Sequence, residues 1–291
     1  MAAVVGVHGI WNYGYFSKGS RLLTAAQQAI SKDWTGWLAD GLSRRDPAVP
    51  APASLPVAYY ADCLSLGVAQ GLNDDPDQLP PLAQELLVEW VQELRVQSAP
   101  GGQAVDMVAA GYPTWPVRQS ADWLTARFGE VARWLVTVLV TDLAVYFDPD
   151  QTGRRQAARQ RVAEAVREHR PRILVAHSLG SVVAYEALRA DPNLRVELLV
   201  TLGSPLAMPR VIFDRLEPAP DNGRAAHPPG VSRWTNIADV GDPVAVPVGG
   251  LQPFFDGQIT DVADRIDMFD PHTAKSYLAC ASLTDALRPY L

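Results

Sequence analysis

The chain has 291 residues, of which 48% are apolar and 20% are charged, a composition typical of a folded protein with a packed core. Its net charge of −7, with 32 acidic against 25 basic residues and no basic stripe, argues against a nucleic-acid binder. Two distant cysteines, Cys63 and Cys280, argue against a disulfide framework or a metal site and favour a reducing, cytoplasmic compartment. We expect neither a signal peptide nor a membrane span, because the apolar runs are too short.

The first 150 residues divide into two parts. Residues 4–7 form an unbroken apolar run typical of a strand buried on both faces, apolar residues recur at helical spacing over 20–42, and 56–60 is a second strand candidate. Residues 62–149 differ, because two apolar stripes predict helices on either side of a turn rich in glycine, proline and tryptophan at 99–116. This stretch interrupts a pattern of alternating strands and helices.

After residue 150 the alternation is regular. The predicted elements are a helix over 156–169, a strand over 172–176, a helix over 181–190, strands over 196–202, 232–237 and 258–262, and a helix over 273–287. Parallel strands need crossover connections, so this order implies a mainly parallel sheet with helices on both faces. We therefore predict one α/β domain over 1–291, in which 62–149 is a helical insertion.

The five residues 176–180, Ala-His-Ser-Leu-Gly, lie between a predicted strand and a predicted helix. A nucleophile elbow needs a sharp turn in this context, with small residues two positions before and after the serine, where strand and helix crowd together. Ala176 and Gly180 meet that need, with alanine where glycine is usual. The helix that follows also favours developing negative charge at its N-terminus. Ser178 is therefore the predicted nucleophile, against the alternative of a chance match at an ordinary strand–helix joint.

An oxyanion hole needs two backbone N–H donors, one of which comes from the residue after the nucleophile, Leu179. The loop over 8–11 follows the first strand at the same edge of the sheet, and Gly9 permits a tight turn there. We predict the N–H of Ile10 as the second donor. The glycine spacing does not fit a dinucleotide-binding fingerprint, and the order Ser-Lys-Gly-Ser at 17–20 is wrong for a phosphate-binding loop.

A serine nucleophile needs a histidine base and an acidic residue that orients it, and after an elbow the chain order is serine, acid, histidine. The histidines are at positions 8, 169, 177, 227 and 272. Elimination by order leaves His272, because His227 precedes any strand that could carry the acid and is expected to be exposed. Both Asp239 and Asp242 follow the predicted strand at 232–237; Asp242 is preferred for its Gly-Asp-Pro turn, with Asp239 as the alternative.

Together these segments resemble lipase- and esterase-type α/β-hydrolases. The elbow is similar to that of the small Bacillus lipases, and Gly203-Ser204-Pro205 after the next strand resembles lipase and acylhydrolase relatives. The resemblance covers roughly 1–60 and 150–291 and leaves out 62–149. It implies an α/β-hydrolase fold without the usual N-terminal strand pair, hence a sheet of about six strands, with the inserted helices as a cap.

The activity implied is acyl transfer through an acyl-enzyme on Ser178, with His272 as base, Asp242 as its orienting acid and no metal or organic cofactor. The expected partner is a small acyl substrate, and an ester with an apolar acyl or aryl group is preferred. Thioesterase, peptidase or amidase activity would use the same residues. The alternative from another class is a non-catalytic binding protein on a hydrolase scaffold.

The preference for an apolar substrate depends on aromatic residues that could line an acyl pocket. They are Trp11, Tyr13, Tyr15 and Phe16 beyond the oxyanion loop, and Trp115, Trp123 and Trp134 in the insertion. The alternative is that these side chains only pack the insertion onto the core. Trp11 and Tyr13 are the predicted substrate-binding residues.

Overall fold

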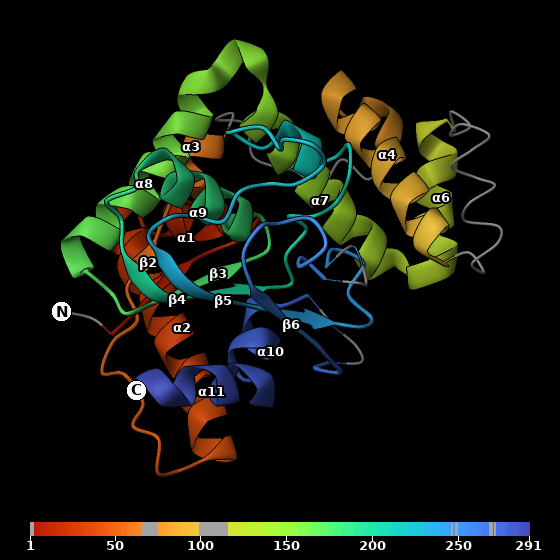
Figure 1. The fold of residues 1–291 in the computed structure, drawn as a ribbon. Helices are drawn as coiled ribbons and strands as arrows, with labels where there is room; N and C mark the ends of the chain where they lie inside the picture. Colours follow the sequence, from red (N-terminus) through yellow and green to blue (C-terminus); the bar gives the residue numbers. More distant parts are fainter. Residues whose placement is uncertain are drawn as a thin grey trace.

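The computed structural model describes residues 3–65, 75–98, 116–245, 247, 250–267, 270 and 272–291. Six strands form one all-parallel sheet in the order β2-β1-β3-β4-β5-β6 (Figure 1). The strands are β1 (Val4–Val7), β2 (Val57–Ala58), β3 (Ile173–His177), β4 (Val196–Leu202), β5 (Val231–Asp239) and β6 (Ile259–Asp264). The predicted parallel α/β sheet is confirmed, and the strand ends differ from the predicted ones by at most two residues.

The helices occupy most of the predicted positions. They are α1 (Tyr13–Lys18), α2 (Leu23–Arg45), α3 (Ala61–Leu64), α4 (Pro81–Ser98), α6 (Val117–Phe128), α7 (Glu130–Phe147), α8 (Thr152–His169), α9 (Leu179–Ala190), α10 (Ala274–Leu278) and α11 (Ala281–Leu287). Short 3₁₀ turns lie at Pro76–Gln78, Pro149–Gln151, Phe213–Arg215 and Arg288–Tyr290.

Two predicted helices are wrong in their extent. The helix expected over 20–42 begins at Leu23, because Ser20 and Arg21 have left-handed φ angles of 57° and 58° that separate it from α1. The helix expected over 273–287 is two helices, because Cys280 is extended at φ −78° and ψ 155° and caps α11. Its Sγ accepts a hydrogen bond from Leu283 N at 3.4 Å.

Helices cover both faces of the sheet because successive strand residues point to opposite sides. In β3, Leu174 and Ala176 pack with α8, α9 and the inserted helices, whereas Ile173 and Val175 pack with α2, α10 and α11. Figure 1 shows α8 and α9 on one side of the strands and α2, α10 and α11 on the other. Each strand therefore contributes to two separate apolar clusters.

The strand order reverses at β1. The chain runs from β1 to the edge strand β2 and later returns to the other side of β1 as β3. The connections at the carboxyl ends of β1 and β3 therefore leave in opposite directions and open a crevice between them. Ligands of open α/β sheets bind at this kind of switch point. The loops that begin at His8 and at Ser178 flank it.

The helices between β2 and α8 are packed against the rest of the chain. Tyr146 of α7 donates a hydrogen bond of 2.6 Å to Glu186 of α9, and Arg155 of α8 forms an ion pair with the same carboxylate. Trp90 of α4 is buried and donates through Nε1 to the carbonyl of Pro243 at 3.0 Å. The predicted helical character of the insertion is confirmed for its described parts, whereas nearly all of the turn predicted at 99–116 lies outside them.

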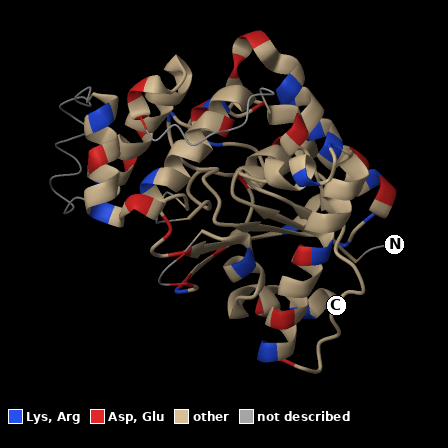
Figure 2. Cartoon of the chain, turned by 180° about the vertical axis from the view of Figure 1, so that it is seen from behind, with Lys and Arg blue, Asp and Glu red and all other residues tan. Residues whose placement is uncertain are grey.

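Charged residues of both signs are mixed over the outer helices, and the central strands carry few of them (Figure 2). In the described ranges, no helix combines the length and the apolarity needed to cross a bilayer. Both cysteines are unpaired, as predicted; Cys280 is buried and Cys63 half-buried.

Candidate active site

Ser178 occupies a strained turn between β3 and α9. Its φ of 55° and ψ of −132° lie outside the regions that residues other than glycine usually adopt, so the surrounding contacts must hold them. Its N–H donates to Leu202 O of the neighbouring strand at 2.9 Å. Its carbonyl accepts the hydroxyl of Ser181 at 2.6 Å and the N–H of Ser181 at 2.9 Å. The turn is fixed on both sides of the serine.

Two glycines allow the loops at the switch point to approach each other. A Cβ on Gly180 would lie 2.3 Å from His8 O, and a Cβ on Gly9 would lie 2.6 Å from the Cβ of Ser178. Both distances are far below contact distance, so neither position tolerates a side chain without movement of the backbone. This gives a physical reason for the small residues that the elbow pattern requires.

Ser178, His272 and Asp242 form a chain of hydrogen bonds. His272 Nε2 lies 2.9 Å from Ser178 Oγ, and His272 Nδ1 lies 2.7 Å from Asp242 Oδ2. A carboxylate only accepts, so Nδ1 carries the imidazole proton and the Nε2 lone pair faces the serine hydroxyl. All three residues are buried. The arrangement can move a proton from the hydroxyl to the imidazole while the carboxylate holds the ring.

Asp239 is engaged elsewhere. Its Oδ1 accepts the N–H of Gly241 at 2.7 Å, and its Oδ2 accepts the N–H groups of Ile266 and Asp267 at 2.6 and 3.0 Å. These bonds tie the loop after β5 to the loop after β6. Of the two candidate acids, the structure brings Asp242 to the histidine and gives Asp239 a role in holding loops.

The loop after β1 has its carbonyl groups tied back by hydrogen bonds. Tyr60 Oη donates to His8 O at 2.7 Å, and His8 Nδ1 lies 2.7 Å from Gly9 O. Asn12 Nδ2 donates to Gly9 O and Ile10 O at 3.2 and 2.7 Å, and Tyr59 Oη donates to Asn12 O at 2.7 Å. The carbonyl groups of the loop are therefore engaged, and the N–H of Trp11 faces Asp142 Oδ2 at 3.5 Å.

The predicted oxyanion donors lie on the two loops that meet at the switch point. Ile10 follows Gly9, where an added Cβ would lie 2.6 Å from the Cβ of Ser178. Leu179 begins α9 directly after the serine. Among the described residues, neither N–H donates to a backbone carbonyl. A developing oxyanion requires two N–H donors of this kind near the serine.

His8 is buried in this loop. Its Nε2 accepts the N–H of Tyr60 at 3.0 Å, so the ring is neutral and donates through Nδ1 to Gly9 O. The ring also stacks on Tyr60, with 4.2 Å between centroids. Burial lowers the pKa of His8 to about 4, against a smaller opposing effect of the Gly9 hydrogen bond. His8 is a structural part of the loop.

His177 joins the two sides of the site. Its Nε2 donates to the carbonyl of His272 at 2.9 Å, and the two rings lie 4.8 Å apart. A Cβ on Gly9 would lie 3.0 Å from its Nδ1, so the ring also packs against the loop after β1. Burial, and then the proximity of His272, hold the pKa of His177 well below its ordinary value. A neutral ring at this position adds no positive charge beside His272.

His227, which the sequence analysis set aside as exposed, is half-buried. It packs edge-on against Trp234, with 5.9 Å between centroids, and its Nδ1 lies 3.0 Å from Pro228 O. Trp234 covers the ring, so the expected exposure was wrong. The residue remains outside the site.

The aromatic candidates are divided between surface and core. Trp11 is 61% exposed and meets Trp134 of α7 edge-on, with 4.5 Å between centroids. Tyr13 lines a small cavity with residues of this loop, of the segment after β2 and of α7. The remaining candidates are used as follows: Tyr15 donates to Asp33, Phe16 contacts Tyr13, Trp123 packs on Phe128, and Trp115 lies outside the described residues.

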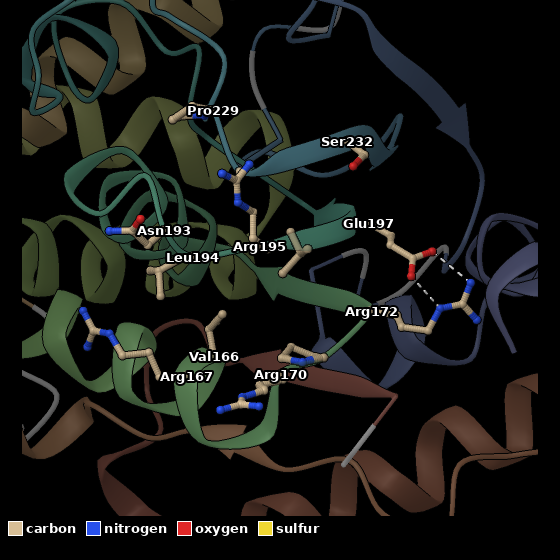
Figure 3. Close-up of a pocket in the computed structure, with 13 residues that line it drawn as sticks. Val166, Arg167, Arg170, Arg172, Asn193, Leu194, Arg195, Glu197, Pro229 and Ser232 are labelled. Carbon is tan, nitrogen blue, oxygen red and sulfur yellow. Dashed lines mark hydrogen bonds and ion pairs between the residues drawn. The ribbon is translucent and has the colours of Figure 1, made fainter.

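An open groove of about 690 Å³ lies at the opposite edge of the sheet (Figure 3). It is bounded by the end of α8 and the amino ends of β3, β4 and β5, and its lining includes Arg167, Arg170, Arg172 and Arg195. Arg172 pairs with Glu197 across the strands. The groove is remote from Ser178, which follows the carboxyl end of β3. Its size therefore does not identify the reactive site.

Sequence reasoning missed Asn12, Tyr60 and Tyr277, all of which bond to the loops that carry the site. Asn12 stands within four residues of Gly9 and could have been considered as a loop-forming residue. Tyr60 and Tyr277 gave no signal beyond their apolar surroundings. No cluster of three or more metal-ligating side chains occurs in the part of the chain that the structure describes.

Comparison of the sequence with protein-family models and with curated proteins, and of the chain with solved structures, found no match. The chemistry of the site is therefore inferred from its geometry.

Proposed function

We propose that the protein is a serine hydrolase of the α/β-hydrolase type that cleaves esters through an acyl-enzyme on Ser178. The observation that carries the proposal is the hydrogen-bonded chain from Ser178 Oγ through His272 to Asp242, at 2.9 and 2.7 Å. Its position at the switch point of a parallel sheet supports it. So does the strained turn that holds the serine.

The reaction has two halves. As Ser178 Oγ bonds to the acyl carbon, its proton passes to His272 Nε2 and the carbonyl π electrons move to oxygen. The N–H groups of Ile10 and Leu179 would stabilise that oxyanion, and one such donor lowers a comparable barrier by about 3 kcal/mol. When the intermediate collapses, the leaving alkoxide takes the proton from His272. Water then attacks the acyl carbon and gives a proton to His272. The bond from Ser178 Oγ to the acyl carbon breaks as Oγ takes that proton back, and the carboxylic acid leaves.

An apolar acyl or aryl group is the proposed substrate feature. Support comes from the exposed indole of Trp11 beside the oxyanion loop, in contact with Trp134 of the insertion. Val131 of α7, close in sequence to Trp134, is also 61% exposed. Because an exposed apolar surface beside a reactive serine suits an apolar substrate group, we assign the inserted helices the role of a cap.

A fluorophosphonate probe tests the nucleophile. We expect the wild type and Ser232→Ala, a change in the remote groove, to be labelled equally, and Ser178→Ala not to be labelled. Folded wild-type protein that resists labelling would refute the enzyme proposal and favour a binding protein. Labelling that persists in Ser178→Ala would mean that the nucleophile is another residue.

Substrate class is tested with p-nitrophenyl esters of increasing acyl length, matched thioesters and peptide anilides. We expect kcat/KM to rise with acyl length and to be greater for esters than for anilides. Faster cleavage of anilides would indicate a peptidase. Faster cleavage of thioesters at each acyl length would indicate a thioesterase.

A further inference from the structure

Tyr277 is a buried residue of α10 that the proposed reaction does not use. Its hydroxyl lies 2.8 Å from Asp242 Oδ2, the oxygen that also accepts His272 Nδ1. The same hydroxyl lies 2.8 Å from the backbone N of Asp239. The phenol of Tyr277 therefore joins the Asp242 carboxylate to the backbone of Asp239, where the loop that carries Asp242 begins.

The direction of these two hydrogen bonds is fixed. The backbone N–H of Asp239 only donates, so it occupies a lone pair of the phenol oxygen. The single hydroxyl proton is then left to point at Asp242, which as a carboxylate only accepts. Burial, and then the negative charge of Asp242, raise the pKa of Tyr277, so the phenol keeps its proton at all physiological pH values.

Asp242 has three donors around a fully buried side chain. Val244 N–H donates to Oδ1 at 2.8 Å, and Oδ2 accepts both His272 Nδ1 and the Tyr277 hydroxyl. A buried carboxylate needs such donors to remain charged. Gly203 closes a further side: a Cβ there would lie 2.9 Å from both Asp242 Oδ2 and the Tyr277 ring. The phenol therefore supplies one of the two hydrogen bonds that hold Oδ2 in place.

We propose that Tyr277 is a positioning residue that fixes the orientation of the Asp242 carboxylate and, through it, the His272 ring. The proposal rests on the serine hydrolase function proposed above. Without the phenol hydroxyl, Oδ2 loses one of two donors, and the carboxylate can rotate about its last bond. The imidazole then spends less time aligned with Ser178 Oγ, and small misalignments of reacting groups lower rates steeply.

The test compares Tyr277→Phe with Tyr185→Phe. Tyr185 is also buried and donates its hydroxyl to Ala226 O at 2.9 Å. Both variants keep the ring; Tyr185→Phe loses this one hydrogen bond, whereas Tyr277→Phe loses the bond to Asp242 and the bond from the N–H of Asp239. We expect Tyr277→Phe to lower kcat and the rate of fluorophosphonate labelling by roughly ten- to hundredfold, with KM little changed. Tyr185→Phe should match the wild type in both rates. Equal rates in the two variants, with similar melting temperatures, would overturn the proposal.

A spectroscopic measurement and a double variant separate positioning from general loosening. The far-downfield NMR resonance of the His272 Nδ1 proton should shift or broaden in Tyr277→Phe and stay unchanged in Tyr185→Phe. In an Asp242→Asn background, Tyr277→Phe should change the labelling rate by less than about twofold, because its effect acts through the carboxylate. An undiminished effect in that background would contradict the mechanism.

These outcomes are distinct from failure of the proposed function. If wild-type protein is not labelled at all, the hydrolase proposal fails, and the NMR comparison still reports whether Tyr277 orients the pair. If wild-type protein is labelled and Tyr277→Phe is labelled as fast, the hydrolase proposal stands and the role of Tyr277 is refuted.

Discussion

The two edges of the sheet differ in how their polar groups are used. At the carboxyl edge, buried side chains such as His8, Asp239 and Asp242 satisfy loop N–H and carbonyl groups and leave Ser178 between two loops. At the amino edge, exposed arginines surround an open groove, and Arg172 pairs with Glu197 where both side chains are about half exposed. The amino edge thus offers an open groove, whereas the carboxyl edge offers organised, buried polar contacts.

For the effect of a substitution, the burial of a polar group matters more than the number of charges around it. Exposed ion pairs contribute little, because water screens them and the long side chains lose freedom when they pair. Buried polar groups must be paired, so their geometry is strictly determined. Substitutions at the carboxyl edge should therefore change activity, and matched substitutions at the amino edge should not.

The largest expected effect separates the two aspartates of the carboxyl edge. We expect Asp242→Asn to lower kcat about 10⁴-fold while the fold persists, because the amide disturbs the tautomer and charge partner of His272. Asp239→Asn should lower the melting temperature and leave kcat within about tenfold, because Asp239 accepts three loop N–H groups.

Steady-state kinetics and thermal unfolding of both variants check this prediction. A large loss of kcat in a stably folded Asp239→Asn, with Asp242→Asn near wild type, would reverse the assignment of the acid.

A pH measurement probes the loop after β1. Because burial lowers the pKa of His8 from 6.5 to about 4, the unfolded chain binds a proton between these values and the folded chain does not. Stability from this group is therefore present above pH 6.5 and is lost as the pH falls toward 4, by at most about 3 kcal/mol.

Denaturant unfolding of the wild type and of His8→Gln between pH 7 and 4 measures how steeply the free energy of unfolding of each protein falls with pH. Other titrating groups contribute equally to both proteins, so the wild type should lose more stability over this range. Parallel curves would mean that His8 is accessible to protons in the folded state, and that the loop is less closed than its hydrogen bonds indicate.

The sequence predicted the residues whose placement follows from chain order and strand polarity. Ser178, Asp242 and His272 come together because each follows or lies beyond the carboxyl end of a parallel strand, and such ends share one edge. The choice between Asp242 and Asp239 needed coordinates, because a rotation of a short loop decides which carboxylate reaches the histidine.

Other features could not be read from the pattern. The break before α11 depends on a backbone conformation at Cys280 that no glycine or proline marks. The tyrosines that support the loops, Tyr60 and Tyr277, act through contacts with residues distant in the chain. Apolar periodicity places such residues in the core and gives no information about where a phenol hydroxyl points.

The same substitution, asparagine to alanine, should have a medium effect at the carboxyl edge and none at the amino edge. Asn12→Ala removes the amide that holds the carbonyls of Gly9 and Ile10, so the Ile10 N–H loses its fixed direction. We expect kcat to fall by roughly tenfold, since oxyanion donors act only when they are correctly placed. Asn193→Ala in the groove should leave kcat unchanged. Equal activity of the two variants would show that the loop keeps its shape without Asn12.

The smallest effect is expected at the amino edge, with Arg172→Ala and Arg195→Ala. Arg195 is exposed, and Arg172 makes an exposed pair with Glu197 and a hydrogen bond of 2.6 Å to Tyr290 O. We expect ester hydrolysis to stay within about twofold of the wild type and the free energy of unfolding within about 1 kcal/mol. A tenfold fall in kcat in either variant would mean that the groove communicates with Ser178. Both edges would then contribute to the reaction, and they would differ only in their exposure to solvent.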